Sequence, residues 1–210
     1  MIVDKPRTRT NDPQGLRNRV LDVAAKSFQT SGYNSTSTHD LVRMAGVTAG
    51  ALHHHFPTKK ALVRAVIGER VAKEIGDTWL SRVRDAPSAA AGILGAFETV
   101  IAALDEQGSV AGCPLGNLTL ELSLADPDLR EALAGQYHLW REAIVDRINR
   151  DPAALGSFGA DPETFATVVV SMFSGAMTIA KAEQNTVALK ATADQLRAIM
   201  TCGAADPATP

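Results

Sequence analysis

The segment STHDLVRMAGVTAGALHHHFPTKK, from Ser37 to Lys60, decides the fold of this 210-residue chain. Its apolar spacing predicts one short helix over 37–45 and a second over 49–55. Gly46 stands between them, where a tight turn favours a residue without a side chain. Two short helices joined by a glycine-containing turn are typical of a helix-turn-helix, whose second helix enters the major groove of DNA.

Residues that favour helix starts stand where these helices are expected to begin. Ser37 is a good N-cap, and Asp40 follows three residues later, where we expect its carboxylate to accept from the N–H of the cap. Thr48 is the corresponding cap of the second helix. Thr58 predicts the start of a longer helix that continues to about Arg84. The helix boundaries in this segment therefore follow from local signals alone.

The composition favours packed helices. The chain is 45% hydrophobic but only 5% aromatic, and Ala and Leu are abundant. We expect an all-α protein of about nine helices, with a three-helix helix-turn-helix domain followed by a helical C-terminal domain. There is no run of eighteen apolar residues and no apolar N-terminal segment, so we expect neither a membrane-spanning helix nor a signal peptide. The expected location is the cytoplasm.

The sequence lacks the patterns of an enzyme. It contains no nucleophile–base pair, no glycine-rich phosphate loop and no spaced cluster of metal ligands, so we expect no catalysis and no cofactor. Consecutive helical side chains point about 100° apart, so His53, His54 and His55 cannot converge on one metal ion. Cys113 and Cys202 are far apart in the sequence and also lack metal-ligand spacing.

Charge is distributed unevenly along the chain, although the net charge is only −2. Residues 1–84 carry fourteen Lys and Arg against seven Asp and Glu, whereas residues 85–210 carry seven against sixteen. A basic first part followed by an acidic remainder indicates that one end faces a polyanion. A solvated charged surface is the alternative interpretation.

Helical periodicity and turn signals divide the rest of the chain. We expect a disordered basic arm over 1–13 and a disordered tail over 203–210. Further helices are expected over 14–31, 88–107, from Pro114 to the break at Asp126, from Pro127 to about Arg150, over 162–184 and over 187–202, with a loop over 151–161.

The run from Arg17 to Ala65 resembles the N-terminal domain of the tetracycline-repressor (TetR) family of bacterial regulators. The resemblance implies a helix-turn-helix domain over 14–74, with the motif itself at 37–56, and a ligand-binding and dimerisation domain over 75–202. It rests on VLDVAA at 20–25, Phe28, GY at 32–33, TS at 36–37, AGV at 45–47, GAL at 50–52, HHFPTK at 54–59 and AL at 61–62.

Two positions depart from the family pattern, and a second motif extends it. His53 stands where the family usually has Tyr, and Lys60 stands where Glu is common. The run GCPLGNLTLELS at 112–123 resembles one branch of the family, in which it lies on the helix that forms the pocket. Compared with the Tyr that is usual in the family, His53 keeps a hydrogen-bond donor for a DNA phosphate but loses apolar contact with the DNA backbone.

The expected DNA contacts follow from side-chain chemistry within this motif. The free N–H groups of helix starts suit phosphates, and small residues let the reading helix approach closely. No Arg lies in that helix, so Arg43 on the preceding helix is the candidate for guanine recognition. The expected contacts are Ser37, Thr38, His39, Arg43, Thr48, Ala49, Gly50, His53, His54 and Lys59.

The helix over 162–184 is so apolar that we expect it to be buried on two sides. One side can cover the core while the other meets a second copy of the chain. The resemblance implies that the last two helices of each subunit form this interface. With one reading helix per chain, the sequence predicts a homodimer on palindromic double-stranded DNA.

The resemblance also implies a small-molecule inducer in the C-terminal domain. We therefore predict a ligand-responsive repressor, and a helical adaptor that does not bind DNA remains the alternative. Many of the candidate pocket residues also suit a plain hydrophobic core. The candidates are Phe97, Cys113, Asn117, Glu121, Tyr137, His138, Trp140, Met172, Met177 and Lys181.

Cys113 stands at the start of a helix, after a glycine-flanked loop. A helix N-terminus stabilises a thiolate, so a lowered pKa and reactivity toward electrophiles are one interpretation. In the family's fold, Lys181 can approach and add a positive charge. A small buried hydrophobic residue is the other interpretation.

Overall fold

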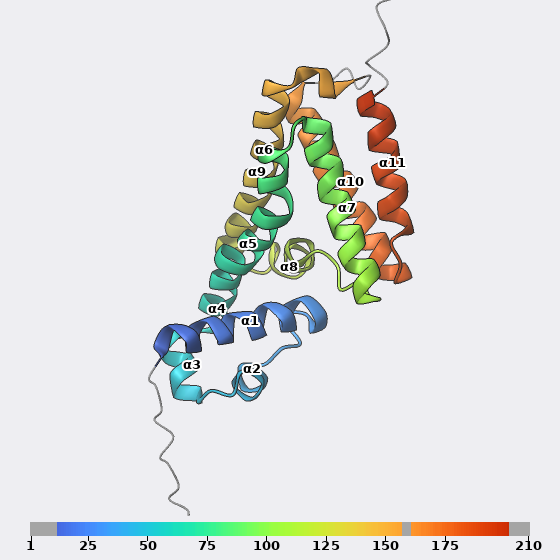
Figure 1. Ribbon diagram of the computed structural model, residues 1–210. Coiled ribbons are helices and arrows are strands. Elements are labelled where there is room, and N and C mark those ends of the chain that lie inside the picture. The colour runs from blue at the N-terminus through green and yellow to red at the C-terminus, as the bar shows by residue number, and fades with distance from the viewer. Residues whose placement is uncertain (1–11, 157–160, 202–210) are drawn as a thin grey trace, which may run out of the picture.

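The computed structural model describes residues 12–156 and 161–201. The expectations for the arm, for the tail beyond 202 and for part of the loop before 162 concern residues outside these ranges. Within them the chain contains nine helices, counting the long central one once, and no strand, which confirms the all-α prediction. Figure 1 shows a small helical head at one end and a bundle of long helices at the other.

The head begins with α1 (Pro13–Ser31), which starts earlier than expected. The predicted arm over 1–13 is too long, because Asp12 caps the helix by accepting from the N–H of Gly15 at 2.8 Å. Pro13 occupies the first helical position, where a missing N–H costs nothing. Both residues are therefore start signals of a helix.

The helix-turn-helix matches its prediction closely. Helix α2 (Thr38–Ala45) is followed by Gly46 in the left-handed conformation (φ 63°) and then by α3 (Ala49–His55). The two helices and α1 share one core. Its buried side chains are Val20, Leu21, Ala24, Phe28, Leu41, Ala45, Leu52 and Phe56.

The long helix predicted over 58–84 is present but is not uniform. Its segments are α4 (Lys59–Val66), η1 (Ile67–Val71), α5 (Ala72–Ile75), η2 (Gly76–Leu80) and α6 (Ser81–Asp85), where η1 and η2 are π-helical. Each π-helical stretch shifts the angular position of every later side chain, and such stretches are frequent at functional sites. This helix connects the head to the bundle (Figure 1).

The bundle contains α7 (Ala89–Gln107), α9 (Pro127–Arg150), α10 (Pro162–Glu183) and α11 (Val187–Thr201), and the short α8 (Pro114–Leu122) lies between the bundle and α1 (Figure 1). The predicted loop over 151–161 contains a short 3-10 helix, η3 (Pro152–Leu155). Four aromatic rings pack edge to face or tilted in the core of the bundle, with centroids 4.8–5.5 Å apart. They belong to Trp79, Phe97, Trp140 and Phe173.

Helix α10 is long and apolar enough to cross a membrane by length and composition alone. Its Phe165, Val169 and Ala180 are fully buried, and it packs against α9 and α11. Ile179 on the same helix is 49% exposed. The helix therefore covers the core with one face, and its exposed side carries the small residues Thr167, Ser171, Gly175 and Thr178 beside Ile179.

Candidate functional site

An open hollow lies between α2, α3 and the start of α4. Figure 1 shows α2 and α3 on the side of the head away from the bundle. The hollow has a volume of about 550 Å³. Six of the ten predicted DNA-contact residues line it, namely Thr38, His39, Ala49, Gly50, His53 and Lys59. All of these except Lys59 are exposed, as are Ser37, Arg43, Thr48 and His54.

Side-chain caps fix both helix starts. The hydroxyl of Thr48 accepts from the N–H of Ala51 at 3.1 Å, as expected for an N-cap. At α2, Ser37 accepts from the N–H of Asp40 at 3.1 Å and donates its hydroxyl to Asp40 Oδ2 at 2.6 Å. The predicted bond from the Asp40 carboxylate to the backbone N–H of the cap is thus replaced by one to the Ser37 hydroxyl. Arg43 lies 3.2 Å from Asp40 and remains exposed.

Lys59 is partly turned into the protein. Its Nζ donates to the carbonyl of Tyr33 at 2.5 Å and lies 4.1 Å from the centre of the Tyr33 ring. Burial lowers the pKa of this ammonium group, and the nearby Glu121 opposes that shift. Lys59 therefore supports the junction between α1 and α4, while its contact with phosphate stays a prediction.

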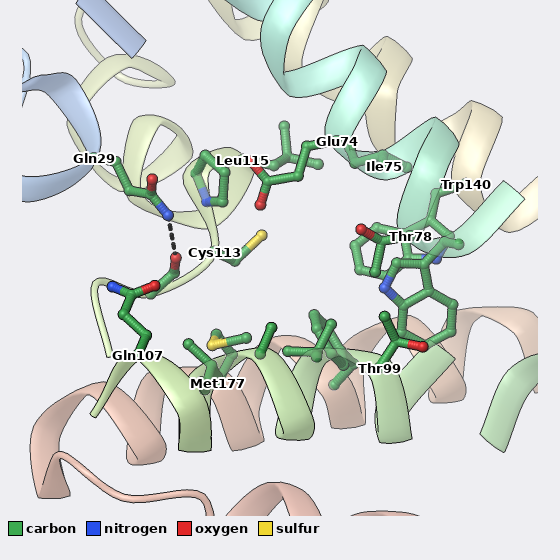
Figure 2. A pocket seen from close by; sticks show the side chains of 17 residues that line it. Gln29, Glu74, Ile75, Thr78, Thr99, Gln107, Cys113, Leu115, Trp140 and Met177 are labelled. Carbon is green, nitrogen blue, oxygen red and sulfur yellow. Dashed lines mark hydrogen bonds between the residues drawn. The ribbon is translucent and has the colours of Figure 1, made fainter. Parts of the chain in front are cut away.

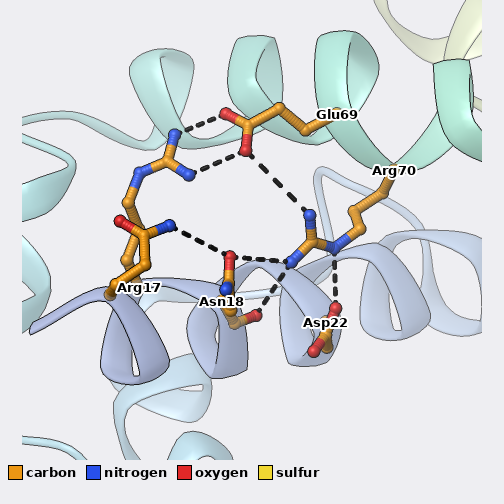
Figure 3. Close-up of polar contacts among 6 residues, drawn as sticks. Arg17, Asn18, Asp22, Glu69 and Arg70 are labelled. Atoms are coloured by element: carbon orange, nitrogen blue, oxygen red, sulfur yellow. Dashed lines mark hydrogen bonds and ion pairs between the residues drawn. The ribbon is translucent and has the colours of Figure 1, made fainter. Parts of the chain in front are cut away.

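A network of charged residues binds α1 to the long helix, and no pattern in the sequence predicted it. Arg17 forms a two-pronged ion pair with Glu69, with Nη1 donating to Oε2 at 2.7 Å (Figure 3). Hydrogen bonding from Arg17 lowers the pKa of Glu69. Arg70 donates its Nε to Asp22 at 2.6 Å and also contacts Asn18. These pairs hold the head in a fixed orientation on the central helix.

Glu121 lines neither of the two hollows beside Cys113, and its carboxylate is engaged with backbone groups, so its role as a ligand anchor stays a prediction. Its two carboxylate oxygens accept from the N–H groups of Tyr33 and Asn34, at 3.0 and 2.9 Å. The carboxylate therefore ties α8 to the turn that precedes the helix-turn-helix.

Gln29 and Asn117 strengthen the same contact between α1 and the loop before α8. Gln29 donates to the carbonyl of Gly112 at 2.8 Å, and Asn117 donates to the carbonyls of Gln29 and Ala111 at 3.1 and 3.0 Å. We call Gln29, Asn117 and Glu121, with these partners, the α1–α8 clasp. Together with the long central helix, it links the head to the C-terminal domain.

A cavity of about 290 Å³ lies directly behind the clasp. Figure 2 shows Gln29, Cys113 and Glu74 toward one end of it and Thr78, Thr99 and Trp140 toward the other. Its remaining walls include the rings of Trp79 and Phe173 and the side chain of Met177. An apolar cavity with a few polar groups is the common form of a small-molecule site.

The structure divides the predicted ligand residues into three groups. Cys113, Trp140 and Met177 line the cavity, as predicted. Asn117, Tyr137 and Lys181 line an adjoining hollow of about 310 Å³, to which Cys113 and Met177 also contribute. The side chains outside both hollows are Phe97, which is fully buried, Met172, which packs against the core, Glu121 in the clasp, and His138, which is exposed with Nε2 3.1 Å from Glu142.

Of the two interpretations of Cys113, the structure favours a small hydrophobic residue over a reactive thiolate. Burial raises the pKa of the thiol to about 11, and the nearby Glu74 adds to the increase. The N–H groups of Gly116 and Leu115 act in the predicted direction, but they are outweighed. Lys181 donates instead to Asn117 Oδ1 at 3.1 Å. Cys113 is therefore a neutral wall of the cavity.

The polar cavity residues Gln29, Glu74, Thr78 and Thr99 were not among the predicted ligand residues. Gln29 and Glu74 lie within the predicted DNA-binding domain over 14–74, whereas Thr78 and Thr99 lie within the predicted ligand-binding domain. Glu74 and Thr78 lie after the first π-helical stretch, so a regular helical projection misplaces them.

Comparison with known proteins identifies the family. The model of bacterial regulatory proteins of the tetR family matches residues 20–66, and that of the C-terminal domain of LmrA/YxaF-like transcriptional regulators matches residues 89–195. The chain belongs to the TetR family. The resemblance that was visible from Arg17 to Ala65 is thereby confirmed, and the protein is a helix-turn-helix transcriptional regulator.

Relatives of this TetR-family regulator match along most of its length. The HTH-type transcriptional regulator LmrA of Bacillus subtilis (strain 168) is 25% identical over 173 residues, which cover 82% of this chain and 90% of LmrA. The uncharacterised HTH-type transcriptional regulator YxaF of the same strain is 22% identical over 181 residues, covering 86% and 92%. The TetR family consists of transcriptional regulators rather than enzymes.

Solved structures share the fold. The reduced form of NemR from E. coli superimposes with a TM-score of 0.82 at 18% identity, covering 91% of this chain and all of that one. A regulatory protein TetR from Rhodobacter sphaeroides gives a TM-score of 0.78 at 21% identity, covering 87% and 97%. These identities establish the arrangement of helices and leave the ligand to be argued from this chain's own residues.

Proposed function

We propose that this TetR-family regulator is a cytoplasmic homodimeric repressor that leaves a palindromic operator when a small molecule fills the cavity behind the clasp. The observation that supports this proposal most directly is that the cavity and the clasp share residues. Gln29 lines the cavity and donates to Gly112, and Gly112 and Cys113 line the cavity at the start of α8. A ligand that moves this wall therefore acts directly on α1.

The DNA-binding part of the proposal is supported by the exposed hollow at the starts of α2 and α3. Its backbone N–H groups and its histidines can contact phosphates, while Thr48 and Ala49 can reach base edges. Dimerisation is supported by the outward side of α10, where small residues surround Ile179, which is 49% exposed, and by Val187 at the start of α11, which is 64% exposed. Two copies joined there would present two reading helices.

A gel-shift experiment on DNA upstream of the protein's own gene tests this function. The proposal expects a specific complex that weakens as salt increases, because phosphate contacts release counterions. Specific binding that competitor DNA of random sequence cannot displace supports it. Absence of any specific complex would contradict it and favour a helical adaptor.

A further inference from the structure

We propose that the cavity behind the clasp selects compact aromatic organic cations, with Glu74 pairing with the positive charge. This inference names the ligand class of the site and rests on the proposed function only for its link to DNA release. Glu74 is the one carboxylate among the residues that line the cavity, and no basic side chain lines it. The charge on its walls is therefore negative or zero.

The described residues provide no partner for the Glu74 carboxylate. It forms no hydrogen bond or ion pair with them, and the side chain is open to solvent where it lines the cavity and an adjoining hollow of about 160 Å³. The side chain is exposed overall, and desolvation by the surrounding protein raises the pKa of its carboxyl group. A carboxylate without a charged partner at the wall of a largely apolar cavity favours a ligand that brings a positive charge.

The basic residues near Glu74 either pair with other carboxylates or form no ion pair with Glu74. Arg70, one helical turn before Glu74, pairs with Asp22 and approaches Glu69 (Figure 3). Lys73 forms an ion pair with Asp77. Lys26 lines the adjoining hollow but forms no ion pair with Glu74 among the described residues. No basic side chain of the described residues therefore pairs with Glu74, and a positively charged ligand can take that place.

The other end of the cavity suits a flat aromatic body. Trp79, Trp140 and Phe173 pack there with ring centroids 4.8–5.5 Å apart. Aromatic faces attract cations as well as rings, and a volume of about 290 Å³ admits a compact molecule. Thr78 and Thr99 add hydroxyl groups beside the rings (Figure 2). Shape and charge together point to an aromatic cation rather than an acid.

Three probes with the same two-ring frame separate charge from shape: 1-methylquinolinium, neutral quinoline and anionic 1-naphthoate. Calorimetric titration of the full chain at neutral pH should show binding of the cation at least about tenfold tighter than that of quinoline, and weakest binding of the anion. Equal affinity for the cation and quinoline, or preference for the anion, would overturn the proposal.

Two variants assign the preference to one side chain. Glu74→Gln keeps the shape of the side chain and should abolish the preference for the cation while leaving quinoline binding unchanged. Asp77→Asn, an exposed carboxylate three residues away, is the matched control and should keep the wild-type preference. Retention of the preference in Glu74→Gln would contradict the role of this carboxylate.

A gel shift with the same proteins distinguishes this inference from the proposed function. Both variants should bind the operator as the wild type does without ligand, which also verifies their folding. Release of DNA by quinoline and by the cation at equal concentrations would leave the repressor intact but refute the charge preference. Failure of wild type to bind any operator would refute the repressor, while calorimetry would still decide the cation preference.

Discussion

The chemical state of Cys113 and the bonding of Glu121 depend on burial and on partners distant in the sequence more than on neighbouring residues. Cys113 stands at a helix start that favours a thiolate, yet burial makes its thiol a weaker acid. Glu121 lies in a motif associated with the pocket, yet its carboxylate holds two backbone N–H groups 87 and 88 positions earlier. Each of these two outcomes leads to a measurement.

Cys113 should react slowly with N-ethylmaleimide at neutral pH. A rise in pKa from 9.0 to about 11 reduces the thiolate fraction about a hundredfold. In a Cys202→Ser background, the native protein should be alkylated far more slowly than the urea-unfolded protein. The native rate should increase as pH rises toward 11, because deprotonation produces the nucleophile. Equal rates in the native and unfolded states would contradict the assignment.

Glu121→Gln should weaken the clasp. Only one of its two acceptor oxygens remains, and the new amide places a donor against a backbone N–H. We expect a loss of about 1–2 kcal/mol in the free energy of unfolding, measured with urea. The exposed Glu131→Gln serves as the control and should stay within about 0.5 kcal/mol of the wild type. Equal stability of both variants would mean that Glu121 contributes nothing to the junction.

At the scale of helices, local signals determine where elements begin and long-range packing determines how they continue. The caps Ser37 and Thr48 and the turn at Gly46 were predictable because each acts within three residues. The π-helical stretches were not, since they depend on how the central helix packs between the head and the bundle.

The cavity was only partly predictable for the same reason. Cys113, Trp140 and Met177 were candidates because the family resemblance placed a pocket in the C-terminal domain. Glu74 was missed because its phase on the central helix changes after Ile67–Val71. Gln29 was missed because it belongs to the head and reaches the cavity only through the tertiary contact with Gly112.

Thr48→Ala should separate DNA recognition from stability. It removes the bond to the N–H of Ala51 and should cost about 1 kcal/mol of stability. Ser88→Ala removes the equivalent cap of α7 and should cost the same. Only Thr48→Ala should weaken operator binding and alter site preference, as measured by gel shift. Equal DNA binding by the two variants would place the recognition surface elsewhere.

At the scale of the whole molecule, charge and apolar surface divide the chain into two ends with different partners. The basic first part carries the exposed starts of α2 and α3, and the acidic part carries the outward face of α10. The clasp joins these ends beside the cavity. Repression in this account needs all three features in one dimer.

Ile179→Asp should break the dimer. A charge buried in the proposed interface is costly, so sedimentation should show monomer at micromolar concentration, and operator affinity should fall at least about tenfold. Leu124→Asp is the control, because Leu124 is 98% exposed and lies after α8, outside the α10 face. A dimeric Ile179→Asp protein would move the interface to another surface.

The most direct test of the central claim is selection of binding sites from random double-stranded DNA by the full chain. A dimer with one reading helix per subunit predicts an enriched sequence of two inverted half-sites. Their centres should be separated by about one turn of DNA, roughly 34 Å, or by a multiple of it. Enrichment of a single asymmetric site, or of no sequence at all, would contradict the account.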